Sequence, residues 1–113
     1  MNVFHYDTVK AQDAGDCCLK TKVRWLITKE LGAQNFAMRL FEMEAGGHSP
    51  LHAHPWEHEV FILEGEGQLF DGEKASAFST EDVVFVPANE RHQFKNTGQK
   101  RLRFLCLIPY TRE

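Results

Sequence analysis

The sequence predicts an all-β domain, a sandwich or a barrel, and three observations lead to that prediction. Short segments in which apolar and polar residues alternate recur along the chain, and such alternation is typical of half-buried strands. Turn signals built on glycine, proline and aspartate separate these segments at short intervals, as they do in sandwiches and barrels. No convincing long helix is present. We therefore expect roughly eight or nine short strands.

The first expected strand spans residues 22–28, where Val23, Trp25 and Ile27 alternate with polar neighbours. Alternation with a period of two places these three side chains on one face of an extended chain. The preceding residues 8–18 lack such a pattern, so we expect a loop or a short irregular turn there.

Glycines bound the next two expected strands. The second strand covers residues 36–43 and ends at the glycine pair 46–47, and the third covers residues 59–63 and ends at a Gly-Glu-Gly turn. From His58 onward, alternation places Val60 and Ile62 on one face of the third strand and its other side chains on the opposite face. Glycine interrupts extended segments because it adopts turn conformations that side chains disfavour. The loop 46–50, which contains His48, is expected to be flexible.

The second half of the chain adds shorter strands separated by turns. A strand at 68–70 leads into Asp71-Gly72, which is a signal for a tight hairpin turn. The remaining strands are expected at residues 74–78, 83–86, 93–95 and 102–108.

Composition limits the kinds of function that this chain can have. Its 113 residues suffice for one domain with a single hydrophobic core. A formal net charge of −3 and the absence of a basic stripe argue against binding to nucleic acid. No apolar run reaches the roughly 20 residues that a membrane helix needs, and the start of the chain lacks the features of a signal peptide.

The three cysteines, Cys17, Cys18 and Cys106, point to a reducing compartment. An odd number that includes an adjacent pair is a poor framework for disulfides, so a cytoplasmic location is expected. Cys106 lies in an apolar strand. Its side chain either packs as a small hydrophobic residue or points its thiol into an interior site.

Four histidines form the pattern with the clearest chemical meaning. His52, His54 and His58 fall within seven residues, and His92 follows a turn further along the chain. Imidazole is the commonest side-chain ligand of transition metals. Side chains two residues apart on a strand share a face, so His52 and His54 point the same way, and the turn at 55–57 lets His58 approach the same point. With His92 arriving from a distant strand, the cluster predicts a mononuclear metal site.

In order and spacing, these residues resemble the two sequence motifs of the cupin superfamily. In the first motif, at about 46–65, a glycine precedes the His-x-His pair by five residues and another glycine closes the segment. In the second, at about 81–96, a Pro-Ala-Asn turn precedes His92. The resemblance covers residues 36–108. It implies a double-stranded β-helix, or jelly roll, with residues 1–113 forming a single cupin domain.

Two motif positions depart from the family pattern, and a third leaves a choice of ligand. Glu81 and Asn89 stand where the motif has glycine, and asparagine tolerates the left-handed backbone. The usual glutamate ligand corresponds by spacing to His58, with Glu59 as the alternative. The chain also resembles small bacterial cupins that have four-histidine sites, which favours His58. The implied ligands are His52, His54, His58 and His92.

Such a site would hold one divalent transition metal ion per chain. Manganese and iron are favoured, and copper, nickel and zinc also accept imidazole. Four neutral ligands leave the charge of the ion uncompensated, which favours anionic oxygen ligands at open positions. Arg39 either faces this cavity and binds a carboxylate or makes a structural contact, and Trp56 either walls the pocket or packs at an interface. His5 and His48 are not expected to bind the metal.

Three functions fit this combination of fold and site. The first is a metal-dependent oxidoreductase, such as a dioxygenase, that acts on a small organic substrate. The second is a non-catalytic protein that binds a small molecule. The third is a metal-dependent isomerase of a sugar or keto acid, in which the ion acts as a Lewis acid. The fold does not choose among them, because the superfamily contains enzymes and binding proteins alike.

The resemblance also implies a homodimer formed through an N-terminal strand and one face of the sheet. The alternating segment 22–27, with Trp25, would suit that interface, since an exposed sheet edge otherwise needs protection. The expected partners are therefore a small molecule and a second copy of the chain, with no nucleic acid and no membrane.

Overall fold

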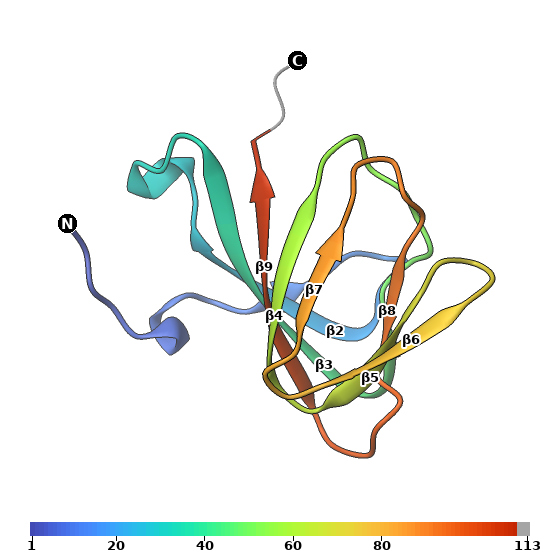
Figure 1. Ribbon diagram of the computed structural model, residues 1–113. Helices are drawn as coiled ribbons and strands as arrows, with labels where there is room; N and C mark the ends of the chain where they lie inside the picture. Colours follow the sequence, from blue (N-terminus) through green and yellow to red (C-terminus); the bar gives the residue numbers. More distant parts are fainter. Residues whose placement is uncertain (111–113) are drawn as a thin grey trace.

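The computed structural model, which describes residues 1–110, confirms the all-β class (Figure 1). The strands are β1 (Gln12–Asp13), β2 (Leu19–Ile27), β3 (Phe36–His48), β4 (His58–Glu64), β5 (Glu66–Phe70), β6 (Ala75–Ser79), β7 (Val83–Val86), β8 (Gln93–Lys95) and β9 (Leu102–Pro109). Two single-turn 3-10 helices, η1 (Tyr6–Thr8) and η2 (Lys29–Leu31), complete the described elements. None of the described helices is long and apolar enough to cross a membrane.

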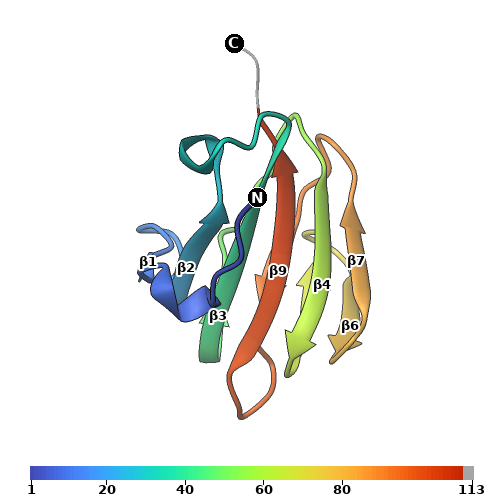
Figure 2. The same ribbon diagram turned by 90° about the vertical axis from the view of Figure 1, so that its left-hand side faces the viewer.

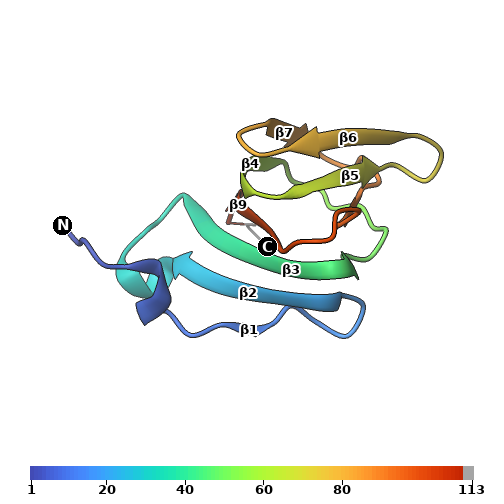
Figure 3. The same ribbon diagram turned by 90° about the horizontal axis from the view of Figure 1, so that it is seen from below.

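The strands form one curled antiparallel sheet. Their order is β6-β5-β8-β3-β9-β4-β7, and β2 and β1 extend the sheet beside β3. A short turn joins β6 to β7, so the two ends of this order meet, as Figures 2 and 3 show from two sides. The sheet thereby closes into the jelly-roll barrel that the resemblance implies.

β3 takes part in both walls of the barrel, and a glycine pair allows it to do so. Its first residues pair with β9, whereas its last residue, His48, pairs with Lys95 of β8. Between these pairings Gly46 has a φ of +80°, and a Cβ on Gly47 would lie 2.7 Å from the Cγ atom of Met43. The expectation that the strand ends at this glycine pair is wrong, because the strand bends there and continues.

The segment around His48 is therefore ordered rather than a flexible loop. The Nδ1 atom of His48 lies 3.1 Å from the carbonyl oxygen of Ser49 and 3.4 Å from the side-chain Nε2 atom of Gln93. The region 8–18 is also more regular than expected, since η1 ends in it and β1 pairs with β2. The sequence pattern missed β1 because a strand of two residues has no periodicity to detect.

The two motif positions that lack glycine keep the glycine conformation. Glu81 has a φ of +71° and Asn89 a φ of +68°, both in the left-handed region. The expectation for Asn89 is confirmed, and Glu81 adopts the same strained region without the local hydrogen-bonding ability of asparagine.

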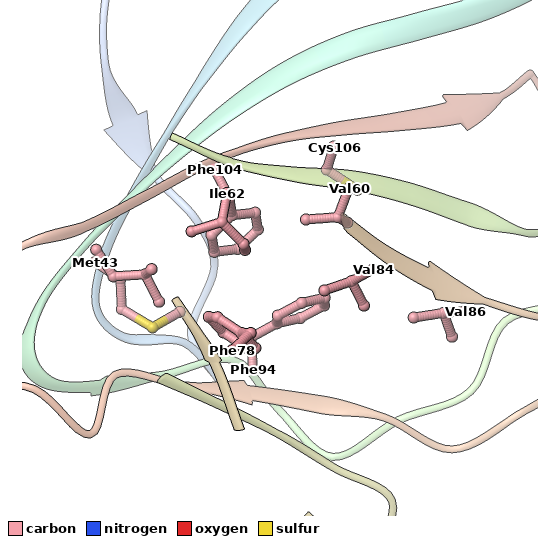
Figure 4. Close-up of a cluster of buried hydrophobic side chains, with 10 residues drawn as sticks. Met43, Val60, Ile62, Phe78, Val84, Val86, Phe94, Phe104 and Cys106 are labelled. Atoms are coloured by element: carbon pink, nitrogen blue, oxygen red, sulfur yellow. The ribbon is translucent and has the colours of Figure 1, made fainter. Parts of the chain in front are cut away.

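Alternation along the strands fills the interior of the barrel. In β4, Val60 and Ile62 are buried and Glu59 and Phe61 are exposed, so the predicted orientation of this strand is confirmed. Figure 4 shows how side chains from facing strands meet. The buried cluster consists of Met43, Val60, Ile62, Phe78, Val84, Val86, Phe94, Leu102, Phe104 and Cys106. Several of these residues also line the cavity described next, so the core forms the floor of the candidate site.

Candidate metal centre

The four predicted ligand histidines come from three places in the chain. His52 and His54 lie in the segment between β3 and β4, His58 is the first residue of β4, and His92 directly precedes β8. The backbones of His52 and His92 pair with each other, with N···O distances of 3.1 and 2.9 Å. This bridge places the distant histidine beside the first of the local ones, which is the convergence that the sequence predicts.

Three of the four imidazoles lie close enough together to share one ion. One ring nitrogen from each of His52, His54 and His92 lies within 4.8 Å of the others. Nitrogens that bind the same ion at 2.0–2.1 Å are separated by about 3–4 Å, so small side-chain movements would complete the site. His58 lies outside this group of nitrogens, although its ring centroid is 4.7 Å from that of His92 and 5.3 Å from that of His54.

The hydrogen bonding of the rings fits a metal ion. The Nδ1 atom of His92 lies 3.0 Å from the carbonyl oxygen of Glu90. Because a carbonyl only accepts, Nδ1 carries the hydrogen and Nε2 keeps its lone pair for a metal. Within residues 1–110, the buried Nδ1 atom of His58 has no hydrogen-bond partner. Such an orphaned group costs about 1–3 kcal/mol, and a metal ion or an ordered water would satisfy it.

Burial favours the neutral form that a metal requires for three of the imidazoles, those of His52, His54 and His58. Loss of solvent, followed by repulsion from His54 and His92, lowers the pKa of His52 to about 4. Loss of solvent, followed by the charges of His92 and Arg39, lowers the pKa of His58 to about 3. The pKa of His54 is also lowered, chiefly by loss of solvent. Metal ions compete with protons for imidazole, so these side chains are available at neutral pH.

The metal-free protein is expected to lose stability as the pH falls from 6.5 towards 4. Histidines of the unfolded chain take up protons near pH 6.5, whereas His52 and His58 resist protonation down to about 4 and about 3 in the folded state. The unfolded state therefore binds more protons in this window, and the free energy of unfolding decreases with falling pH.

Urea unfolding of chelator-treated protein across this pH window would measure the effect. A variant that carries both His52→Gln and His58→Gln should show a smaller loss, because it lacks these two proton acceptors. The same pH profile for the wild type and the variant would contradict the assigned protonation states.

The histidines open on a cavity of about 360 Å³. The rings of Phe94 and Phe104 stack at a centroid distance of 4.9 Å, and those of Phe41 and Phe104 at 5.2 Å, so one side of the cavity is aromatic. Small-molecule sites measure roughly 300–1,000 Å³, which indicates a small ligand here. A wider recess of about 940 Å³ around Gly65 and Gly98 has no histidine in its lining.

The structure shows the surroundings of the residues whose orientation the sequence leaves open. Arg39 faces the cavity, and its guanidinium donates a hydrogen bond to the Sγ atom of Cys106 at 3.1 Å. Cys106 packs in the hydrophobic core and also lines the cavity, so both interpretations of its side chain apply. Trp56 stacks on His54 at 4.4 Å with an interplanar angle of 5°, which orients that ring. Glu59 is exposed on the outer face, away from the cavity.

One part of the cavity was not anticipated. The loop between β1 and β2 brings Cys17 and Cys18 to the cavity lining, together with Asp16. Neither cysteine belongs to the group of potential ligands found among the described residues. No pattern in the sequence places this loop at the cavity, because its position depends on the pairing of β2 with β3.

Comparison with known proteins identifies the family. The sequence model of the cupin domain family matches residues 39–108 of this chain. The chain is 38% identical over 76 residues to the 1-methylthio-D-xylulose 5-phosphate methylsulfurylase of Rhodospirillum rubrum, a match that covers 67% of this chain and 49% of that protein. It therefore spans about half the length of this relative. It is also 37% identical over 87 residues to the oxalate-binding protein of Thermotoga maritima, covering 74% of this chain and 70% of that one.

Similar solved structures include a cupin 2 conserved barrel domain protein from Rhodopseudomonas palustris, with a TM-score of 0.77 at 30% identity, covering 93% of this chain and 71% of that one. The polyketide cyclase RemF from Streptomyces resistomycificus aligns with a TM-score of 0.92 at 32% identity, covering 99% of this chain and 81% of RemF. The whole barrel and the segment before it are thus shared. On its sequence motifs, its barrel and these matches, the chain belongs to the cupin domain family.

Proposed function

We propose that this cupin is a metal-dependent oxidoreductase, of the dioxygenase kind, that acts on a small organic molecule. The observation that carries the proposal is the cluster of imidazoles in the lining of a cavity with aromatic walls. One ion per chain, manganese or iron in the first place, would be held by His52, His54, His58 and His92. When bound, the ion supplies Lewis acidity and, if it is redox-active, one-electron chemistry.

The residues of the chain itself would position the substrate. Phe41, Phe94 and Phe104 offer a flat apolar surface on which an aromatic ring or a conjugated carbon chain can pack. The ring of Trp56 covers one face of His54, so it restricts both the movement of that imidazole and the access of water. A small cavity that excludes water strengthens the electrostatic contacts made inside it.

The names of the relatives support two alternatives. The Thermotoga maritima protein is named for binding oxalate, which favours a non-catalytic role in small-molecule binding. The Rhodospirillum rubrum protein is named for a reaction on a sugar phosphate, which favours a Lewis-acid reaction such as the isomerisation of a sugar or keto acid. In both alternatives the ion keeps its oxidation state.

The metal content and the reaction of the loaded protein would test the proposal. Untagged protein, purified without chelator, is expected to contain close to one equivalent of manganese or iron. With enolic and phenolic compounds under oxygen, this protein should consume oxygen, and zinc-loaded protein should not. A tightly held redox-active ion without oxygen uptake would favour the binding role, and turnover with zinc would favour the isomerase. If the protein neither contains nor takes up a metal ion, the four-histidine site and both enzymatic functions are wrong.

We also propose a homodimer that is formed through the outer face of β4 and β7. Phe61, Val83 and Phe85 are 40, 75 and 53% exposed, and register pairs Phe61 with Val83. Their strands, β4 and β7, lie side by side in the broad sheet of Figure 2. Contiguous exposed apolar surface marks interfaces. Trp25 in β2, which the sequence suggested for this interface, lies on the other side of β3 and β9 from these residues.

Light scattering is expected to give twice the 13.0 kDa mass of one chain. Replacing Phe61 with aspartate should give the mass of one chain, because burial of a carboxylate opposite apolar residues is unfavourable. As a control, Leu31→Asp changes another exposed apolar residue outside this face and should leave the dimer intact. A wild-type monomer at micromolar concentration would contradict the proposal.

We further propose a cytoplasmic location. Cys17, Cys18 and Cys106 are all free thiols, and free thiols persist in reducing compartments. Cell fractionation tests this location, and recovery of the protein from the medium or from an oxidising compartment would contradict it.

A further inference from the structure

Arg39 is a cation in the cavity wall that has no acidic partner among residues 1–110. Its guanidinium carbon lies 5.3 Å from the ring centroid of Trp25 and 4.8 Å from that of Phe41, and its hydrogen bond goes to the thiol of Cys106. No ion pair to Arg39 occurs in the described part of the chain. Its Nε atom is buried and finds no acceptor there. Since a thiol is a weak acceptor, most of the hydrogen-bonding capacity of the guanidinium is unused.

The arginines that gather around Glu42, on the opposite face of β3, contrast with Arg39. Arg24 and Arg103 contact the buried carboxylate of Glu42 at 2.9 and 3.3 Å, and Arg101 contacts Glu42 at 3.5 Å. Stacking on Trp25 and Phe41 accounts for the faces of the Arg39 guanidinium. It does not account for the Nε–H group, which lies in the plane of the guanidinium and needs an acceptor at its edge.

With a metal ion bound, the cavity would carry excess positive charge. An ion held by neutral imidazoles would keep its full charge, and Arg39 adds one more. Asp16, which is exposed, is the one carboxylate among the described residues that line the cavity. A charge removed from water without a counter-ion is unfavourable, so a negatively charged ligand gains more from this cavity than a neutral one of the same shape.

We propose that Arg39 binds the anionic end of the substrate, and that the substrate is a small organic carboxylate with a flat apolar body. A guanidinium presents parallel N–H donors that match the two oxygens of a carboxylate. The ring stack of Phe41, Phe104 and Phe94 receives the apolar body. This inference rests on the proposed function, because the metal ion would define the reacting end of the molecule.

Benzoate and benzamide are suitable probes, because they share a shape and differ in charge. Calorimetry on manganese-loaded wild type should show that benzoate binds and that benzamide binds far more weakly. Arg39→Gln should weaken benzoate binding by about tenfold or more and leave the affinity for manganese unchanged. Arg39→Lys should be intermediate, since an ammonium group keeps the charge but not the paired donors. Arg91→Gln, which removes an exposed arginine outside the cavity lining, should bind benzoate like the wild type.

A measurement on the wild type avoids dependence on the folding of the variants. The Nε–H resonance of Arg39 should shift when benzoate is added and should stay in place with benzamide. Equal benzoate affinity in the wild type and in Arg39→Gln, an unshifted resonance, or no binding of benzoate by the wild type would overturn the inference. If the wild type takes up no metal ion, the proposed function fails, and the benzoate titration of the metal-free protein still decides the role of Arg39.

Discussion

Replacing His92 with alanine is expected to weaken metal binding by more than about a hundredfold, because even the loss of a residue that only supports a ligand costs about 10–100-fold. His92 supplies one of the three mutually close ring nitrogens, and its ring is held by the carbonyl group of Glu90. It also comes from a distant part of the chain. His52, His54 and His58 cannot supply a nitrogen at the position of the His92 ring, because the backbone pairing of residues 52 and 92 fixes where each side chain starts.

Competition with a fluorescent chelator would measure the affinity, and thermal unfolding gives a second readout. An ion that binds the folded state alone stabilises it by about 2.7 kcal/mol when its free concentration is a hundred times its Kd. Manganese should therefore raise the melting temperature of the wild type and leave that of His92→Ala nearly unchanged at the same concentration.

Two controls make this result specific. His48→Ala removes an imidazole that lies outside the cavity lining, and it should bind metal like the wild type. Glu59→Gln should also be neutral, because Glu59 is on the outer face, whereas His58→Ala should lose affinity. If Glu59→Gln lost as much affinity as His92→Ala and His58→Ala lost none, the four-histidine ligand set would be wrong and Glu59 would be the ligand.

Replacing Leu102 with alanine is expected to lower the free energy of unfolding by about 2–5 kcal/mol. Leu102 is fully buried at the start of β9, where it pairs with Met43 of β3 and belongs to the core cluster. The smaller side chain leaves a void that a closed barrel fills poorly, since strands on both sides fix the backbone. The loss is a large fraction of the roughly 5–15 kcal/mol that stabilises a typical domain.

Urea unfolding of the metal-free protein would measure this loss, with Leu31→Ala as the matched control. Leu31 lies in η2 and is 42% exposed, so the same atoms are removed from a side chain that is already partly in water. We expect a loss below about 1 kcal/mol there. Equal losses of unfolding free energy at the two positions would contradict the conclusion that the buried contacts of Leu102 stabilise the barrel.

The sequence by itself determined the features that depend on neighbours along the chain. Alternation along 58–63 correctly predicted which side chains of β4 are buried, because successive residues of a strand must face opposite ways. The spacing of His52 and His54 and the turns before His58 and His92 were enough to nominate four histidines that the structure brings to one cavity.

The tertiary structure alone decided the features that depend on strands distant in sequence. The sequence could not show that β3 continues past its glycine pair, because the continuation depends on the pairing of His48 with Lys95. It also left the direction of Arg39 open, because both faces of its strand are partly covered and the sequence shows no clear polar face. The sequence could not show whether a carboxylate lies beside Arg39, because other strands supply the residues around it. Local patterns thus predict which side chains share one face of a strand, and only the folded sheet determines which face lines the cavity and which residues lie opposite it.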